Sequence, residues 1–527
     1  MRSLSVAKWT LVSRVAGVVR VAVIAAVLGP TFFGNAFQAM NLLPNLTYEF
    51  LTGSLFTSLL VPSLVRHVDR SDREAVERVA GGFLGVALVG FAAVTTVVIV
   101  AGPLVVNVLT IGVNDPSVLA AQRRVGLPLL VMLMPQVVLY GVAATGAAVM
   151  NAYGRFSLAA AAPAFESLGV VVTMGLSAVV FGSAPDIDAV TTPQLLLLGI
   201  GTTLAVGIHT AAQWWGASRV GVRLRPRAGW RDSEVREVVR RAIPSLGYAG
   251  LNSSRVFAML VVANRLPGGV VAFRLAVNFF QLPVAVWARP VAVASLPRLS
   301  RLHQARSERL FHDEVVRALA LALFLTIPAA VAYAVLARPI AKAVSLGAMG
   351  SSAGVTLVAA SLAALALGIV GETVFVVLSH AFYARNDAHT PLRSMIVRTC
   401  FAMAGIVVGF RFVEGTAILV ALGLAVSLGN LVSAQHLAWH LRTELPPPDA
   451  RLGPSLLRAC GASALMSVPA YIVASYLPGA GPLRDFGAMV FASAVGLATL
   501  VAVHRWWRSP ELGALLGSIS PVASKDA

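Results

Sequence analysis

Charged residues interrupt the apolar stretches of this sequence, and arginines outnumber acids among them. An ionised side chain inside an apolar helix is costly and normally faces a cavity or an oppositely charged partner. Because a guanidinium can fork onto phosphate oxygens, the arginines predict a cationic cavity for an anionic head group. Internal ion pairs that lock helices together are the alternative for any single arginine, but one such pair would not need arginines in both halves of the chain. The charged residues are Arg14, Arg20, Glu49, Glu166, Arg255, Arg274, Arg289 and Glu372.

Arg14 and Arg20 belong to the first apolar stretch and stand six residues apart. On a helix this spacing corresponds to about 600° of rotation and about 9 Å of rise, so the two side chains lie on different sides and at different depths. We expect one of them to face a lumen. The other is expected to snorkel towards the surface or to pair with a carboxylate such as Glu49.

The acids inside apolar stretches admit three roles: counter-ion to an arginine, site of proton or cation coupling, or protonated hydrogen-bonding group. We favour the counter-ion role for Glu49 and leave the roles of Glu166 and Glu372 open. His209 stands near the Trp214–Trp215 pair, which is typical of an interfacial aromatic belt, so we expect His209 at the membrane interface.

The composition excludes a water-soluble protein. Of 527 residues, 57% are hydrophobic and 12% charged, and the mean hydropathy is +0.80. About 20 apolar residues cross a bilayer core as a helix, so an all-α integral membrane protein is predicted. Cys400 and Cys460 lie in apolar runs and are expected to be packing residues. The sequence offers no Cys/His metal cluster and no phosphate-binding loop, so we expect no metal, cofactor or enzymatic activity.

A membrane glycosyltransferase or ligase acting on a polyprenyl lipid is the best enzymatic alternative. Such enzymes need acids on substantial extracytoplasmic loops, and here those loops are short, with Asp186 and Asp188 as their main acids. This is a thin basis for catalysis.

The apolar stretches predict about fourteen transmembrane helices, and loop charge predicts their orientation. With the first residue in the cytoplasm, the arginine-rich loops 66–78, 218–241, 298–309, 385–398 and 442–458 all fall inside. The net charge of +18 therefore reflects topology, with affinity for anionic phospholipids and no nucleic-acid role. Both termini are predicted to be cytoplasmic. The predicted spans are 6–28, 32–66, 79–101, 118–150, 156–182, 193–217, 236–264, 270–297, 315–337, 353–382, 392–411, 416–440, 454–477 and 484–504.

Two phrases occur twice and divide the chain. Pro62 to His67 (PSLVRH) reappears as Pro297 to His303 (PRLSRLH), and the Tyr153–Arg155 phrase with Pro163 reappears as Tyr383–Arg385 with Pro391. Repeated multi-helix units are a hallmark of secondary transporters. We predict a six-helix N-terminal lobe at 1–228, a six-helix C-terminal lobe at 229–445, and a two-helix hairpin with a short cytoplasmic tail at 446–527, after the linker Pro446–Pro448.

Three local features of the sequence predict details of the helices. The long second span should kink at Pro44. The Arg223–Arg241 segment should include a short amphipathic surface helix that joins the lobes. The glycines Gly81, Gly85 and Gly90 follow the small-residue spacing that is typical of close helix–helix packing.

Five motifs follow one another along nearly the whole chain. They are Thr10 to Gly29; Asn35 to Phe37 with Leu43 to Leu46, Gly53 to Phe56 and Val61–Pro62; Asn151 to Phe156 with Pro163 to Phe165; Leu296 to Arg301; and Ala381 to Asp387 with Thr390–Pro391. In this order they resemble the motifs of the MurJ/MviN family, the lipid II flippases of the multidrug/oligosaccharidyl-lipid/polysaccharide (MOP) exporter superfamily.

The resemblance implies a cavity between two six-helix lobes, alternating access, and a groove at the last two helices for a lipid tail. It implies substrate-binding roles for Arg14 and Arg20, which match the family's cationic set. The sequence departs from the family pattern at other positions. Val21, Asn35 and Thr52 stand where the family usually has acids, and Thr47–Tyr48 and Asn278 stand where it usually has basic residues. Arg255 and Arg274 are hypothesised to replace the lost charge from the second lobe.

We therefore expect a flippase in the bacterial cytoplasmic membrane. Its implied cargo is a polyprenyl-pyrophosphate-linked saccharide, with the peptidoglycan precursor lipid II as the first choice. A flippase for another polyprenyl-linked glycan and a non-transporting scaffold for envelope synthesis stay open as alternatives. A drug/cation antiporter of the same superfamily is less favoured. Cell-wall synthesis proteins are expected partners, and the substrate-binding set is Arg14, Arg20, Asn35, Arg255, Arg274 and Asn278.

Overall fold

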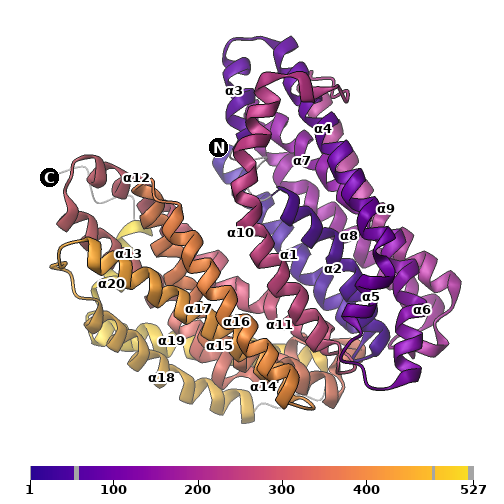
Figure 1. The fold of residues 1–527 in the computed structure, drawn as a ribbon. Coiled ribbons are helices and arrows are strands. Elements are labelled where there is room, and N and C mark those ends of the chain that lie inside the picture. Colours follow the sequence, from indigo (N-terminus) through magenta and orange to yellow (C-terminus); the bar gives the residue numbers. More distant parts are fainter. Residues whose placement is uncertain (1, 53–58, 477–480, 520–527) are drawn as a thin grey trace. The chain divides into compact units, whose positions relative to one another are not determined.

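The computed structural model describes residues 2–52, 59–476 and 481–519, and the regular structure in these ranges is helical throughout, without a strand (Figure 1). The first half of the chain contains α1 (Arg2–Leu28), α2 (Phe32–Thr52), α3 (Val61–Asp69), α4 (Arg73–Val100), α5 (Gly102–Leu109), α6 (Pro116–Leu133), α7 (Gln136–Ala152), α8 (Phe156–Phe181) and α9 (Thr192–Arg219). The second half contains α10 (Ser233–Ala263), α11 (Gly269–Pro283), α12 (Arg289–Gln304), α13 (Glu308–Val335), α14 (Ala337–Val344), α15 (Ser352–Ala384), α16 (His389–Phe412) and α17 (Ala417–Glu444). Helices α18 (Leu452–Tyr476), α19 (Pro482–Trp506) and α20 (Pro510–Ile519) follow.

The described residues contain 13 helical stretches long and apolar enough to cross a membrane. Each coincides with one of the predicted spans, which confirms an all-α integral membrane protein. The remaining prediction, span 32–66, includes residues 53–58 and the motif Gly53 to Phe56, which lie outside the described residues. Helix α2 runs through Pro44 as one helix, and the bend predicted there stays a prediction.

Prolines divide two of the predicted spans. The stretch predicted as one helix at 118–150 forms α6 and α7, with a break at Met134–Pro135. Similarly, a π-helical segment at Val284–Ala288 follows Pro283 and separates α11 from α12. A proline has no backbone N–H to donate to the preceding turn, so these breaks are expected where a proline enters a helix.

The internal repeat is visible in the helix lengths. Helices α4 and α13 have 28 residues each, and the eight-residue helices α5 and α14 follow them in the two halves. The turn before each long helix contains a non-glycine residue with positive φ, Ser71 at 55° and Arg306 at 52°. The repeated phrases at Pro62 and Pro297 therefore lead into the same structural element. The short helices α5 and α14 were not predicted from the sequence.

Packing divides the chain into two compact units. The first comprises Met1–Val271 with Gly347–Met349, and the second comprises Ala272–Leu346 with Gly350–Ala527. Helix α10, which the repeat assigns to the second half, packs against α2 in the first unit. The predicted lobe limits at 228 and 445 refer to the repeat and stay predictions.

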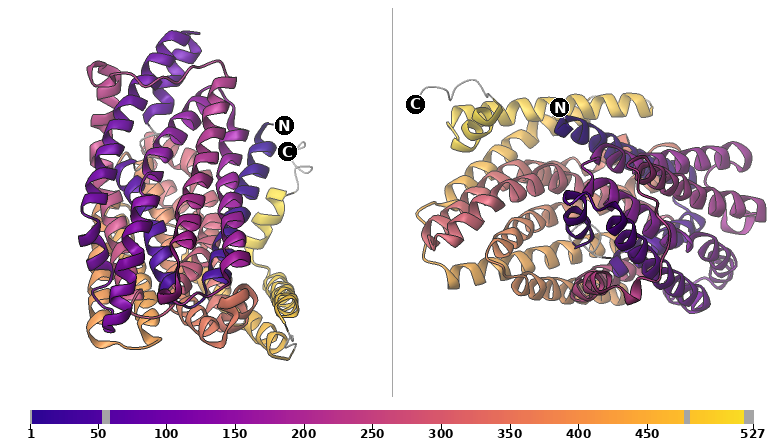
Figure 2. Two further views of the ribbon diagram at one scale, coloured as in Figure 1. Left: turned by 90° about the vertical axis from the view of Figure 1, so that its right-hand side faces the viewer. Right: turned by 90° about the horizontal axis from the view of Figure 1, so that it is seen from above.

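The last two long helices belong to the second unit, where α18 and α19 pack on each other and α18 packs on α13 (yellow in Figure 2). The preceding linker is held on α13. The His312 Nδ1 lies 2.7 Å from the Pro446 carbonyl oxygen, and the Ala450 N–H donates to Asp313 Oδ1 at 2.8 Å. The triproline segment is thus a fixed connection to α18.

The glycines of α4 face an extended segment of chain, so the predicted helix–helix contact at Gly81 and Gly85 is wrong. The Arg227 N–H donates to the Gly81 carbonyl at 2.9 Å, and a Cβ on Gly85 would stand 2.0 Å from the Arg227 carbonyl oxygen. Nothing lies within 4 Å of a Cβ at Gly90. A row of glycines admits an extended chain as readily as a helix, because both need a surface without side chains.

The same segment corrects the expected surface helix at Arg223–Arg241. Residues 222–228 are not helical, a single 3-10 turn spans Gly229–Arg231, and the following helix is continuous with the transmembrane part of α10. Asp232 caps this helix by accepting from the backbone N–H groups of Glu234 and Val235. Amphipathic residues after Ser233 therefore extend a span instead of forming a separate helix.

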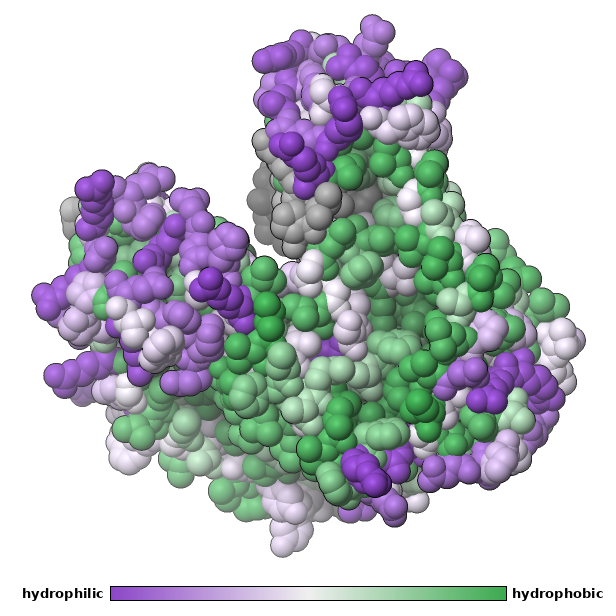
Figure 3. All heavy atoms as spheres, viewed as in Figure 1, coloured by the Kyte–Doolittle hydropathy of each residue, from purple (hydrophilic) through white to green (hydrophobic). Residues whose placement is uncertain are grey.

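The surface pattern agrees with a membrane environment. Large apolar side chains are exposed along the helix flanks, including Val179 at 84%, Phe412 at 78% and Tyr476 at 82%. In Figure 3 each unit shows a hydrophobic flank and a hydrophilic cap over one end of its helices. Exposed apolar surface on this scale is explained by lipid contact.

Candidate functional site

A buried polar network in the first unit is centred on Glu166 of α8. The Arg20 Nη1 on α1 lies 2.5 Å from Glu166 Oε1 and forms an ion pair with it. The Tyr140 hydroxyl on α7 donates to the same oxygen at 3.1 Å. The His209 Nδ1 on α9 lies 3.0 Å from Glu166 Oε2. Four helices are thus joined through one carboxylate.

His209 is buried among the helices of the first unit, and its predicted place at the membrane interface stays a prediction. His209 is only 9% exposed, and its Nε2 lies 3.5 Å from Gln213 Nε2, one turn along α9. The Gln213 amide nitrogen also donates to the Ala159 carbonyl at 3.2 Å. Since an amide nitrogen is a donor, the arrangement makes His209 Nε2 an acceptor and its Nδ1–H the donor to Glu166.

The first helix presents its two arginines differently. The Arg20 side chain is 28% exposed and joined to Glu166, whose side chain is 9% exposed. Arg14 is exposed, and no hydrogen bond or ion pair connects it to another described residue. The prediction that the two occupy different environments is confirmed. The counter-ion of Arg20 is Glu166 and not Glu49, which is itself an exposed residue of α2.

Asn35 is fully buried and connects α2 to the turn between α10 and α11. Its Nδ2 donates to the Leu266 carbonyl at 2.6 Å, and its Oδ1 accepts from the Val270 N–H at 2.9 Å. An aspartate at this position could accept but not donate, so the amide suits this turn better than the acid expected from the family pattern. A role in substrate binding stays a prediction.

The remaining predicted cavity residues lie on two helices. Arg255 of α10 is 7% exposed, donates from Nη2 to Asn252 Oδ1 at 2.9 Å, and belongs to the first compact unit. Arg274 and Asn278 of α11 belong to the second unit and are half-buried, and Asn278 Nδ2 donates to the Arg274 carbonyl at 2.9 Å. Packing therefore brings Arg255 together with the helix of Asn35, while Arg274 and Asn278 lie on α11 of the other unit.

The second unit has its own buried ion pair. The Arg398 Nη2 on α16 lies 2.6 Å from Glu372 Oε2 on α15, and the guanidinium stands over the Phe375 ring at 5.4 Å. One turn before Arg398, Ser394 Oγ lies 2.7 Å from His436 Nδ1 on α17. The predicted loop 385–398 and the predicted span 392–411 both include Arg398, and the structure places it within α16. The long apolar run around Glu372 was the only available signal for a buried partner.

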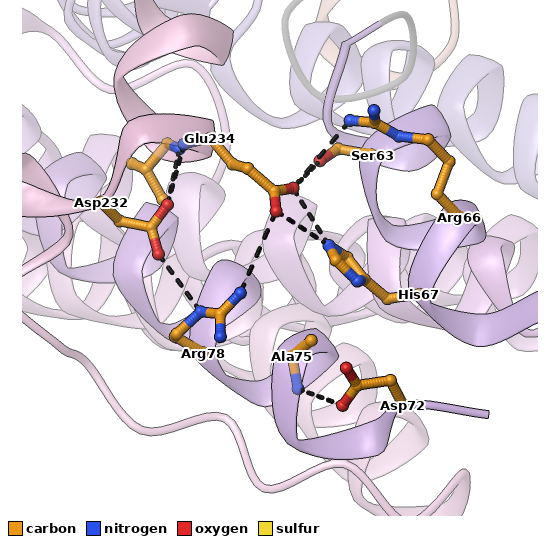
Figure 4. Close-up of polar contacts among 9 residues, drawn as sticks. Ser63, Arg66, His67, Asp72, Ala75, Arg78, Asp232 and Glu234 are labelled. Atoms are coloured by element: carbon orange, nitrogen blue, oxygen red, sulfur yellow. Dashed lines mark hydrogen bonds and ion pairs between the residues drawn. The ribbon is translucent and has the colours of Figure 1, made fainter. Parts of the chain in front are cut away.

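A third polar cluster lies at the arginine-rich end of the first unit (Figure 4). Glu234, at the start of α10, accepts from Ser63 Oγ at 3.2 Å, and the His67 Nε2 on α3 lies 3.0 Å from its Oε2. Burial alone would raise the pKa of the Glu234 carboxyl, but His67, Ser63 and Arg66 together hold that pKa below its ordinary value. Arg78 of α4 adds an ion pair to Asp232 at 3.3 Å. The cluster therefore fixes three helix ends together.

Two apolar cavities lie within the second unit. One, of about 340 Å³, is formed by α13, α18, α19 and α20, with Phe324, Met466 and Leu500 in its wall. The other, of about 750 Å³, is lined by residues of α12 and α13 and by Glu511 of α20. No group of His, Cys, Asp and Glu suited to holding a metal ion occurs in the described part of the chain.

The comparison with protein families decides where this architecture belongs. A model of the family described as "Lipid II flippase MurJ" matches residues 24–492. The chain belongs to the lipid II flippase MurJ family. It is 26% identical over 386 residues to a probable lipid II flippase MurJ of Rhizobium tropici, covering 73% of this chain and 70% of that protein. It is 23% identical to the lipid II flippase MurJ of Burkholderia cenocepacia, covering 75% of each.

Solved structures show the same fold. A lipid II flippase MurJ in an inward closed conformation matches with a TM-score of 0.71 at 16% identity, covering 95% of this chain and 98% of that one. An inward-facing MATE family transporter of the MOP superfamily matches with a TM-score of 0.65 at 15% identity, covering 82% and 94%. The fold is therefore that of MurJ and of MOP superfamily transporters, and the chain is a multi-pass membrane protein.

Proposed function

We propose that this protein moves lipid II from the inner to the outer leaflet by alternating access between its two lobes. The main support for this proposal is Arg20. This arginine lies on a membrane-spanning helix, is partly exposed, and is held in place by a buried carboxylate. A pyrophosphate is an anion that arginine recognises through paired hydrogen bonds. The relatives' names state lipid II as the cargo of those proteins, and the proposal extends it to this chain.

The proposed binding set is Arg14 and Arg20, with Arg255, Arg274, Asn35 and Asn278 as secondary members. The role is transport without a catalysed reaction. The lipid tail is proposed to use the cavity of about 340 Å³ at α13, α18 and α19, whose wall is apolar. A cavity of this size can take a segment of a polyprenyl chain, while the rest of the chain stays in the lipid as the head group crosses.

The alternative cargo is another polyprenyl-linked glycan. The observation that favours it is the departure from the family pattern at Asn35 and Asn278, both of which bond to backbone groups in this structure. A non-transporting envelope-synthesis scaffold would also tolerate such changes. We propose the cytoplasmic membrane of a bacterium as the location, with both termini cytoplasmic. Anionic phospholipids at the arginine-rich ends and cell-wall synthesis proteins are the proposed partners.

The test combines binding and transport. Native mass spectrometry of the detergent-extracted protein, offered lipid II and other polyprenyl-pyrophosphate glycans in competition, should show preferential binding of lipid II. In proteoliposomes, fluorescent lipid II in the inner leaflet should become accessible to a membrane-impermeant quencher. Arg20→Gln should slow this about tenfold or more, which is the loss of one charge-assisted contact of about 1.5–3 kcal/mol.

Arg219→Gln is the matched control. Arg219 ends α9 and stacks on Trp215 with 5.2 Å from Cζ to the ring centroid, so it lies outside the proposed binding set. Preference for another glycan lipid would support the alternative cargo. Binding of no glycolipid, or unchanged flipping in both Arg14→Gln and Arg20→Gln, would overturn the proposal.

A further inference from the structure

Arg20 stands between a buried acid and accessible space. One of its terminal nitrogens is joined to Glu166 at 2.5 Å, while 28% of the side chain stays exposed. A guanidinium has five N–H donors, so an ion pair with one carboxylate oxygen leaves donors for a second anion. Arg20 can therefore contact an incoming phosphate without leaving its helix position.

Glu166 depends on Arg20 for its charge balance. Its other partners are the Tyr140 hydroxyl and His209 Nδ1, and the Tyr48 ring of α2 packs on Tyr140 with 5.5 Å between ring centroids. The other charged groups of the packed helices are Arg14 on α1 and Glu49 on α2, both exposed, and Lys8 and Arg219 near helix ends. Arg20 is thus the one permanently charged partner within hydrogen-bond distance of Glu166 in the described residues.

We propose that binding of a pyrophosphate to Arg20 is coupled to uptake of one proton by the Glu166–His209 pair. This inference rests on the proposed function and adds the proton to it. The proton comes from solvent and adds to the carboxylate or to the imidazole that it faces, so no bond is broken. The two groups lie within hydrogen-bond distance at 3.0 Å, so the added proton can reside on either of them.

The physical cause is competition between two anions for one cation. A phosphate on Arg20 places negative charge a few ångströms from Glu166, and like charges at that distance disfavour the ionised carboxylate. Protonation removes the conflict, while Tyr140 and Arg20 can still donate to a neutral carboxyl oxygen. The consequence is a head group that crosses with one of its charges compensated by the protein's own proton uptake.

The coupling predicts a specific pH dependence. Where one proton is taken up per lipid bound, the dissociation constant rises up to about tenfold for each pH unit of increase. Lipid II is a suitable probe because its pyrophosphate is a diester whose two ionised oxygens do not titrate near neutral pH. Glu166→Gln removes the titrating carboxylate and keeps its size, so binding in this variant should be at least as tight and independent of pH.

The experiment is titration calorimetry of the full-length protein with lipid II in detergent, in two buffers of different ionisation enthalpy between pH 5.5 and 8. The wild type should take up close to one proton per lipid II at the pH of steepest change, and Glu166→Gln close to none. Glu74→Gln, an acid-to-amide change at an exposed site in the first turn of α4, is the matched control and should behave as the wild type.

The outcomes separate the inference from the function. Lipid II binding by the wild type without proton uptake would overturn the coupling and leave the flippase proposal intact. The same holds for uptake that persists in Glu166→Gln. If Glu166→Gln does not fold, proton uptake by the wild type alone decides whether lipid II binding is coupled to a proton. No binding of lipid II would overturn the proposed function and the coupling with it.

Discussion

Removing one partner of the Glu372–Arg398 pair should cost much more than removing both. The pair joins α15 to α16 with side chains 15% and 6% exposed, so neither charge has water to replace its partner. Breaking a buried pair from one side typically costs about 3–5 kcal/mol, whereas replacing both members with apolar residues is often neutral. The perturbation is Glu372→Leu, Arg398→Met and the double variant.

The two single variants should respond differently to pH. A carboxylate stranded by Arg398→Met can take up a proton, and protonating an ordinary glutamate costs about 3.7 kcal/mol at pH 7 and about 1 kcal/mol at pH 5. The destabilisation from the stranded charge should therefore reach at most about 3.7 kcal/mol at pH 7. It should fall by about 2.7 kcal/mol at pH 5. A guanidinium stranded by Glu372→Leu cannot lose its proton, so that variant gains no such relief, although the Phe375 ring continues to face the cation.

The assay is the melting temperature of nanodisc-embedded protein, compared with the wild type at each pH. For a unit or chain of this size, about 3.7 kcal/mol corresponds to a loss of about 3–7 °C, and about 1 kcal/mol to about 1–2 °C. The double variant should melt within about 1–2 °C of the wild type. A double variant that loses as much as the sum of the singles would refute the ion-pair reasoning. Normal stability with lost flipping in all three would instead assign Glu372 to coupling.

Three further predictions concern the first unit. Gly85→Ala should displace the segment at Arg227, because the new Cβ would stand 2.0 Å from a carbonyl oxygen, and trypsin should then cut there several-fold faster than in Gly90→Ala, whose Cβ meets nothing within 4 Å. Asn35→Ala should lower the free energy of unfolding by about 1–3 kcal/mol, because it leaves the buried Val270 N–H without its acceptor, although the Leu266 carbonyl keeps its bond from the Gly269 N–H. Asn278→Ala loses only a bond within its own helix and should cost less than about 1 kcal/mol in the same thermal assay. The pKa of the Glu234 carboxyl in the folded protein lies below its ordinary value of 4.5, so the ionised carboxylate stabilises the fold fully above that pH and loses this effect as the pH falls further. Glu234→Gln should therefore lower the melting temperature at pH 7 and lower it much less at pH 3.5. An equal loss at both pH values would contradict this role of Glu234.

The sequence was sufficient for the spans and for the repeat, because both are carried by local pattern. It did not reveal α5 and α14, because the predicted spans end at 101 and 337 and an eight-residue segment beside Pro103 or Pro339 is too short for its pattern to distinguish a helix from a loop. It also could not show what the glycines of α4 contact. The requirement for a bare surface is the same whether the partner is a helix or the extended chain at Arg227.

The polar network around Glu166 shows more clearly what could not be predicted from the sequence. Arg20 and Glu166 are separated by 146 residues, and no sequence pattern favours Glu166 over the nearer Glu49 as the counter-ion. The contact of His209 with Glu166 was not predicted, because the burial of His209 depends on the face of α9 on which it lies, and its neighbours Trp214 and Trp215 do not show which face that is. The charged residues within the spans could be identified from the sequence, but only the tertiary contacts show which of them pair.

The bonds of Asn35 have a consequence for the biosynthesis of the protein. Its amide donates to a carbonyl 231 residues further along the chain, beyond the whole of the first repeat. At a synthesis rate of about 5–20 residues per second, roughly 10–50 s pass before Leu266 is made. During that interval α2 enters the bilayer with an unsatisfied amide, so the nascent first unit must be sheltered at the site of insertion until α10 docks. Completion of the first unit is thereby tied to translation of the second repeat.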